Sequence, residues 1–129
     1  MGYRVLTMKW ITRAFVSEHR DCIFLFGDNV ARRGLGGQAA AMRGEPNVVR
    51  IPTKKLPSNS ETAFFTDAEF EQNKAAIDKA FERLAVICST TGQVIVIPAN
   101  GIGTGRAQLE SRAPLTFAYL QKRLGDLSL

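Results

Sequence analysis

The chain alternates short apolar runs with longer amphipathic segments. Tyr3–Met8 alternates roughly as a half-buried strand does, whereas Cys22–Phe26 and Val94–Ile97 are continuous apolar runs and Val48–Ile51 is apolar except for Arg50. Short runs of this kind, bounded by turn residues, are typical of strands that are buried on both faces. The run before Pro52 is expected to stop there, because proline cannot donate to a sheet ladder. The pattern therefore predicts four strands.

The strongest helical signal lies between the third and fourth strands. Apolar residues recur at helical spacing from Phe70 to Leu84, and charged residues occupy much of the other face. Thr66 and Glu69 have the spacing of a capping box, which predicts where this helix begins. We expect the helix to pack on the sheet and to have a structural role.

The segment before this helix, residues 56–66, is expected to be a loop that contains Phe64 and Phe65. The two rings could pin the loop to the core, or the loop could lie over a site as a lid. We favour the first interpretation, in which both rings have a structural role.

The remaining segments give weaker helical signals. Residues 10–18 suit a helix or a strand, and the alanine-rich residues 38–44 favour a short helix. Residues 108–124 predict a last helix with a boundary or kink at Pro114. Strands and helices thus alternate, which predicts one α/β domain over residues 1–129. We expect three layers, with a mixed or mostly parallel sheet and helices on both of its faces.

Two glycine-rich loops each follow a predicted buried strand. The first begins at the turn Gly27-Asp28-Asn29 and continues through residues 34–37, and the second carries three glycines at alternate positions within residues 98–106. Glycines allow backbone N–H groups to approach a ligand without obstruction by a Cβ. A helix start adds unpaired N–H donors and a positive dipole end. Each loop is therefore a candidate site for phosphate or another anion.

If the two strands are neighbours in the sheet, both loops flank one crevice, because ligands of open parallel sheets gather at strand carboxyl ends. Lys54 follows another predicted strand and is a candidate anion contact, although we favour its interpretation as a plain surface lysine. The candidate ligand-binding residues are Gly27, Gly34, Gly36, Gly37, Gln38, Thr53, Lys54, Asn100, Gly101, Ile102, Gly103, Thr104, Gly105 and Arg106.

Composition adds an electrostatic bias. The formal net charge is +5 and the pI is about 9.6, which favours anionic partners without separating a nucleotide from a nucleic acid. The basic residues of one stretch could gather on one face or form an ordinary solvated surface. These residues are Arg32, Arg33, Arg43, Arg50, Lys54 and Lys55.

Several classes of protein have little support. No run approaches the roughly 20 apolar residues that span a bilayer, and the N-terminus lacks a signal-peptide core, so we expect a cytoplasmic protein without a membrane partner. With two cysteines and one histidine there is no zinc-binding pattern, and neither a metal nor a cofactor is expected. No G-x-x-x-x-G-K-[ST], G-x-G-x-x-G or G-x-S-x-G motif occurs in the sequence.

In these two loops the chain resembles a macro domain, the α/β module that binds ADP-ribose and related nucleotides. The first similarity is the strand Cys22–Phe26 followed by Asn29 and the loop Gly34-Leu35-Gly36-Gly37-Gln38-Ala39; the second is Ile102-Gly103-Thr104-Gly105 after a Val/Ile-rich strand. The chain also looks like small bacterial and phage proteins of no established activity that share FGDN, GLGGQAAAMRGEPN, IPTK and GIGTG.

The resemblance implies a macro-like fold that binds ADP-ribose or a related nucleotide diphosphate, or another phosphorylated small molecule. It also suggests an ADP-ribosyl hydrolase, in which the catalytic residues are Asp28, which orients or deprotonates a water, and Asn29, which fixes the ribose. From the residues alone, the same pair could be a turn that satisfies backbone groups. The alternative function is a basic nucleic-acid-binding accessory protein in which the glycines form structural turns.

Overall fold

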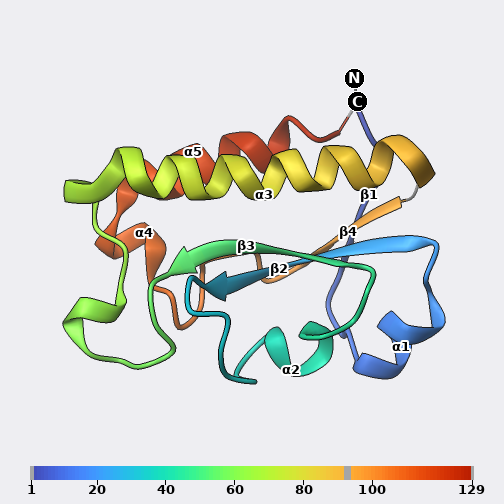
Figure 1. Cartoon of the computed structure of the whole chain (residues 1–129), viewed down its shortest axis with the longest axis horizontal. Coiled ribbons are helices and arrows are strands. Elements are labelled where there is room, and N and C mark those ends of the chain that lie inside the picture. The colour runs from blue at the N-terminus through green and yellow to red at the C-terminus, as the bar shows by residue number, and fades with distance from the viewer. Residues whose placement is uncertain (1, 92–93, 129) are drawn as a thin grey trace.

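The computed structural model describes residues 2–91 and 94–128, and it has the three layers that the alternation predicts (Figure 1). All strand pairs of the central sheet are parallel, and the strand order is β1-β4-β2-β3. The strands are β1 (Val5–Met8), β2 (Cys22–Asn29), β3 (Val48–Lys54) and β4 (Val94–Pro98). The expectation of a mostly parallel sheet is confirmed.

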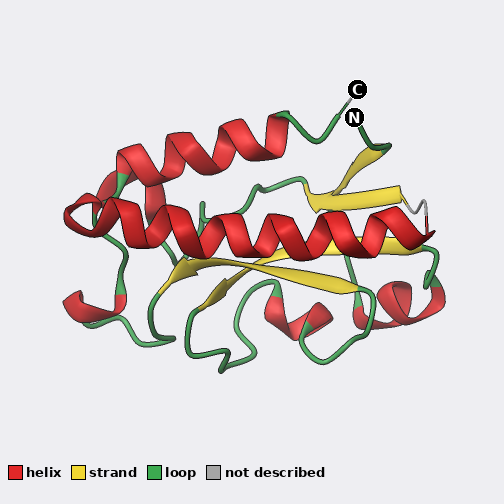
Figure 2. Cartoon of the chain, turned by 45° about the horizontal axis from the view of Figure 1, so that its top comes forward, coloured by secondary structure: helices red, strands yellow, loops and turns green. Residues whose placement is uncertain are grey.

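Helices cover both faces of this sheet, as Figures 1 and 2 show. The two long helices lie together on one face, and two short helices lie on the other. The long helices are α3 (Phe70–Thr91) and α5 (Pro114–Gly125), and the short ones are α1 (Arg13–Glu18) and α2 (Ala39–Met42). A further single turn, α4 (Leu109–Arg112), precedes α5.

The alternation of side chains along β2 divides the core into two parts. Ile23 and Leu25 point toward α3 and α5, where they join the larger buried cluster. Phe24 and Phe26 point the other way and pack with residues of α1 and α2. Successive side chains of a strand face opposite sides of a sheet, so one continuous apolar run supplies both cores.

Two strands extend beyond the ends that the sequence suggests. β2 does not break at Gly27 but continues to Asn29, and β3 does not stop at Pro52 but continues to Lys54. The two strands pair with each other up to Asn29 and Lys54, with an irregularity in register between Asp28 and Asn29. Pro52 is tolerated because β3 is an edge strand and its outer side needs no ladder hydrogen bond.

The helix boundaries are partly as expected. Residues 10–18 contain a helix, and the hydroxyl of its N-cap Thr12 accepts a hydrogen bond from the Phe15 N–H at 3.1 Å. Pro114 begins α5, which confirms the expected boundary. The capping box is wrong, because a 3₁₀ turn, Asp67–Glu69, precedes α3 and the carboxylate of Glu69 pairs with Lys55.

The interpretation of residues 56–66 as a loop pinned by its aromatic residues is confirmed. Phe64 and Phe65 are both buried, and Phe65 joins the larger core cluster. Within the described residues, no helix has the length and apolar character that a membrane span needs.

The sheet order creates one place where strands part. β2 pairs with β4 only from Cys22 to Phe24, whereas it pairs with β3 as far as Asn29. Beyond Phe24 the ends of β2 and β4 diverge, and each continues into one of the glycine-rich loops. The carboxyl ends of parallel strands that part in this way commonly border a ligand site.

Candidate functional site

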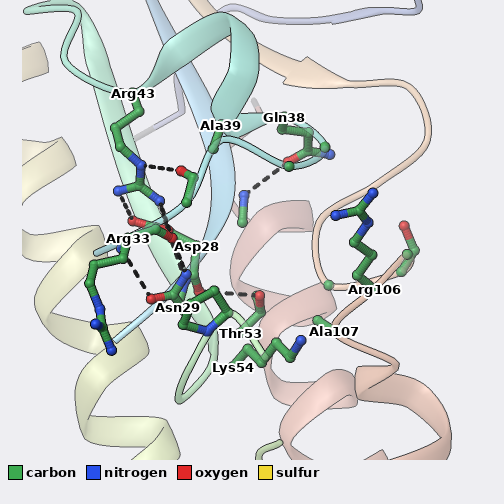
Figure 3. A pocket seen from close by; sticks show the side chains of 18 of the residues that line it. Asp28, Asn29, Arg33, Gln38, Ala39, Arg43, Thr53, Lys54, Arg106 and Ala107 are labelled. Atoms are coloured by element: carbon green, nitrogen blue, oxygen red, sulfur yellow. Dashed lines mark hydrogen bonds and ion pairs between the residues drawn. The ribbon is translucent and has the colours of Figure 1, made fainter. Parts of the chain in front are cut away.

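A pocket lies at the carboxyl ends of β2, β3 and β4, and both glycine-rich loops line it (Figure 3). Its cavity volume is about 180 Å³. The structure thus brings together residues that are more than 60 positions apart in the sequence, such as Gln38 and Gly101. The candidate residues that line the pocket are Gly27, Asp28, Asn29, Gly34, Gly36, Gly37, Gln38, Thr53, Lys54, Gly101, Gly103, Thr104, Gly105 and Arg106.

Two candidate binding residues, Asn100 and Ile102, are absent from the lining. The side chain of Ile102 is fully buried in the larger core cluster, where it anchors the second loop. Asn100 is exposed outside the pocket, and its carbonyl accepts a hydrogen bond of 2.6 Å from the Thr104 hydroxyl. The Thr104 hydroxyl therefore closes the turn of the loop.

The side chain of Gln38 joins the two loops. Its Oε1 accepts a hydrogen bond from the Gly27 N–H at 2.9 Å, and its Nε2 donates to the Gly101 carbonyl at 2.8 Å. A side-chain amide can do both because it carries a donor and an acceptor. Gln38 therefore fixes the end of β2 against the loop that follows β4, and it holds the pocket walls in a defined position.

Two glycines are required by the close approach of the second loop. A Cβ at Gly27 would lie 3.3 Å from Ile102 Cγ2 and 3.3 Å from Thr53 Oγ1. Gly103 has a φ of +82°, and a Cβ there would lie 3.0 Å from Leu109 Cδ2. Side chains at these positions would separate the loop from the strand ends, so both glycines shape the pocket before any ligand is present.

Asp28 is held by two arginines. Its Oδ1 accepts a hydrogen bond from Arg43 Nη2 at 2.5 Å and its Oδ2 accepts one from Arg50 Nε at 2.8 Å, while the carboxylate side chain is only 1% exposed. Burial opposes ionisation of Asp28, but the hydrogen bonds from Arg43 and Arg50 outweigh it and keep the pKa of this carboxyl below its usual value. Asp28 is thus a buried, ionised group with both oxygens occupied.

Asn29 closes the turn that leads into the first glycine loop. Its Nδ2 donates to the Arg33 carbonyl at 2.8 Å, and its Oδ1 accepts from the Arg33 N–H at 3.3 Å. This arrangement matches the alternative interpretation of Asn29 as a residue that satisfies backbone groups after the strand. Figure 3 shows Asn29, Asp28 and Arg43 together on one side of the pocket.

Lys54 and Arg106 lie on the other side of the pocket (Figure 3). The expectation of a plain surface lysine at position 54 is wrong, because Lys54 is only 7% exposed and its ammonium lies 4.7 Å from the centre of the Phe64 ring. Burial lowers the pKa of this ammonium, and the nearby cations Arg106 and Arg112 lower it further. No carboxylate among residues 2–91 and 94–128 is within ion-pair distance of Lys54 or Arg106.

Arg112 is a further cation close enough to Lys54 to lower the pKa of its ammonium. Its guanidinium lies 3.7 Å from the centre of the Phe64 ring and donates to Glu61 at 2.8 Å. Because Glu61 is highly exposed, water screens its charge and it compensates little of the positive potential in the pocket. The pocket therefore has one side on which Arg43 and Arg50 are paired with the Asp28 carboxylate, and one side, around Lys54, on which the cations of the lining have no carboxylate partner among the described residues.

The expected contribution of helix ends is small. α2 has only four residues, Ala39–Met42, and ends before Gly44, so it supplies little of the dipole that a longer helix would have. The same holds for α4. Attraction for an anion in this pocket must come mainly from the side-chain cations and from individual backbone N–H groups.

Sequence reasoning did not include five lining residues among the candidates: Arg33, Ala39, Arg43, Pro57 and Ala107. One feature of the sequence indicated that Arg33 and Arg43 could bind an anion, since both belong to the basic stretch of the first half of the chain. That stretch does not form one basic face. Arg43 and Arg50 neutralise Asp28, Lys55 pairs with Glu69, and Arg33 and Lys54 line the pocket.

The fold and the pocket together define a three-layer α/β protein with a cation-lined site at the carboxyl ends of a parallel sheet. Residues 6–123 match a family of unknown function (DUF7831), so the chain belongs to this family. No curated protein and no solved structure matches the chain. The similarity to macro domains stays a prediction that rests on the sequence of the two loops.

Proposed function

We propose that this pocket binds ADP-ribose or a related nucleotide diphosphate, or another small molecule that carries phosphate groups. The observation that carries the proposal is the cation of Lys54, a residue that is only 7% exposed and that lines the pocket without a carboxylate partner among the described residues. The two free thiols, Cys22 and Cys88, are compatible with the reducing cytoplasm that the sequence suggests.

A buried cation without a partner is costly for the folded protein. Charged groups are rarely buried unless they are paired, because the interior solvates them poorly. Here the cost is raised by two further cations, Arg106 and Arg112, which repel Lys54. An anionic ligand would remove both penalties. The arrangement is thus unfavourable in the free protein and favourable in a complex, which is typical of a binding site.

The number of cations supports a ligand with more than one negative charge. Lys54 and Arg106 line the pocket directly, and Arg33 lies at the first loop. Guanidinium groups suit phosphate oxygens, since they present several donors in one plane. Backbone N–H groups of the two loops, which have no side chains at their glycines, would complete the contacts with a diphosphate.

The geometry favours binding over hydrolysis. Both oxygens of Asp28 already accept hydrogen bonds from Arg43 and Arg50, and its pKa is lowered. A carboxylate in this state is a weak base and has no free oxygen for a water. We therefore assign Asp28 a positioning role, in which it holds Arg43 against the first loop, where Arg43 Nε also donates to the Gly34 carbonyl at 2.7 Å.

Isothermal titration calorimetry with a small set of ligands tests this proposal. ADP-ribose, ADP, AMP, pyrophosphate and uncharged ribose would each be titrated at low and at moderate salt. We expect saturable binding of ADP-ribose and ADP that persists at moderate salt, weaker binding of AMP, and none of ribose. Equal signals for ribose and ADP, or no binding of any phosphate compound at low salt, would refute the proposal.

A further inference from the structure

A second, larger recess lies beside the outer edge of β3, with a volume of about 490 Å³. Its walls come from α3, from the loop after β2 and from the turn between α2 and β3. The cations that line it are Arg32, Arg43, Arg50, Lys79 and Arg83, and the carboxylate in the lining is that of Glu45. We refer to this recess as the β3 groove.

The charges of the β3 groove do not cancel. Glu45 is neutralised from elsewhere, since its two oxygens each lie 2.8 Å from an arginine, Arg13 or Arg20. Arg43 and Arg50 in turn neutralise Asp28. Three further cations therefore remain without a carboxylate partner in the described parts of the chain: Arg32, Lys79 and Arg83.

The positions of Lys79 and Arg83 strengthen this observation. They are four residues apart on α3, so they follow each other along one side of the helix at a rise of about 6 Å. Like charges at this spacing destabilise a helix, and an anion between them would reverse the effect. Ala76 and Ala80 lie on the same side of the helix, and their small side chains leave the floor of the groove open.

We propose that the β3 groove binds the phosphodiester backbone of a single-stranded nucleic acid. Two cations on α3 without a carboxylate partner line the same recess as a third, Arg32, and a chain with repeated negative charges suits such a cluster. A single strand can enter a recess between a helix and a strand edge, whereas a duplex could offer its phosphates only at the rim.

An acidic peptide fits the β3 groove less well. Peptides that bind at a sheet edge usually add a strand through main-chain hydrogen bonds. The edge of β3 is poorly suited to this, because Pro52 has no N–H and the charged Arg50 lies along the same edge. Phosphates need only the side-chain cations, whose guanidinium groups bind phosphate oxygens well.

This inference goes beyond the proposed nucleotide site and does not depend on it. Arg43 lines both recesses, but the unpaired cations of the β3 groove are absent from the lining of the glycine-loop pocket. The two sites can therefore be tested by separate variants.

Fluorescence anisotropy with a labelled single-stranded DNA of about twelve nucleotides tests the inference. The test variant is Lys79→Gln/Arg83→Gln, in which both substitutions fall at exposed helix positions and glutamine is a good helix former. The control is Lys9→Gln/Lys122→Gln, which lowers the net charge equally at exposed positions outside the groove. A duplex of the same sequence and a glutamate-rich peptide are the competing ligands.

We expect the test variant to bind the single strand at least about tenfold more weakly than the wild type, with the control nearly unchanged. Its plot of log affinity against log salt should be shallower by about 1.4, since each phosphate contact contributes about 0.7 for single strands. Equal losses in both variants, or no binding at low salt, would overturn the inference. Tighter binding of the duplex or of the peptide would overturn the assignment to a single strand.

Discussion

Two buried charges at the ends of neighbouring strands differ in how they are compensated. Asp28 lies near the end of β2 and Lys54 at the end of β3, and the two strands pair as far as Asn29 and Lys54 with an irregularity in register after Asp28. Asp28 has two arginine partners, and each of its oxygens accepts a hydrogen bond. Lys54 has an aromatic ring beside it and two repelling arginines nearby.

The difference fits the proposed function, in which Asp28 is a structural charge and Lys54 is a binding charge. Around Asp28 the protein itself supplies the partners, so the charge of Asp28 is compensated without a ligand. Around Lys54 no carboxylate among the described residues is within ion-pair distance, and the proposed anionic ligand would compensate this charge. Conspicuous acidic residues in a pocket are thus not necessarily its reactive groups, and the less conspicuous lysine is the better candidate for ligand contact.

The largest expected effect concerns stability. Asp28→Asn should lower the free energy of unfolding by about 3 kcal/mol, because removal of the buried carboxylate charge leaves two partly buried arginines without their partner. The estimate lies at the low end of the usual range because Arg43 and Arg50 keep 20% and 26% of their side-chain surface exposed. Urea denaturation measures this value, with Asp126→Asn in an exposed ion pair as the control. A loss below about 1 kcal/mol would contradict the structural role of Asp28.

A smaller effect is expected on ligand binding when the second loop acquires a side chain. Gly105 lines the pocket, and a Cβ there meets no atom within 4 Å, so Gly105→Val should fold normally. The valine would obstruct approach of a phosphate to the backbone and weaken ADP-ribose binding at least about tenfold, or 1.4 kcal/mol. The control is Gly125→Val, which also adds a Cβ in open space but at the end of α5.

The smallest effect is a dependence of affinity on pH. The pKa of the free Lys54 ammonium lies below its ordinary value of 10.5, and a bound anion favours the charged form and raises this pKa. ADP-ribose should therefore bind most tightly below the lowered pKa and more weakly as the pH rises through it toward 10.5. Calorimetry in buffers of different ionisation enthalpy should detect proton uptake on binding in this range. Proton release there would contradict the assignment.

The fold was largely predictable, because periodicity is a local property of the sequence. The continuous apolar run Cys22–Phe26 indicates a strand with two buried faces, and the structure uses its alternate residues for two cores. The ends of elements were less predictable. β2 and β3 extend each other by pairing as far as Asn29 and Lys54, and this depends on a partner strand that is distant in sequence.

The pocket was predictable in outline but not in its charge pairing. The glycines marked both loops, and the neighbouring positions of β2 and β4 brought them together. Arg43 and Arg50 donate hydrogen bonds to the Asp28 carboxylate although they are 15 and 22 residues away in the sequence. No local pattern of the sequence reveals contacts over such separations. Ile102 was misplaced for a related reason, since its motif gave no sign that its side chain enters the core.

The most direct test compares Lys54→Met with Lys55→Met, the same change at the adjacent lysine, which pairs with Glu69. For each variant, the free energy of unfolding and the affinity for ADP-ribose would be measured. If Lys54 is a binding charge, Lys54→Met leaves stability equal or higher, because an unpaired buried cation is removed, while ADP-ribose binding falls at least about tenfold and Lys55→Met retains it. Loss of stability in Lys54→Met with unchanged affinity would contradict the account.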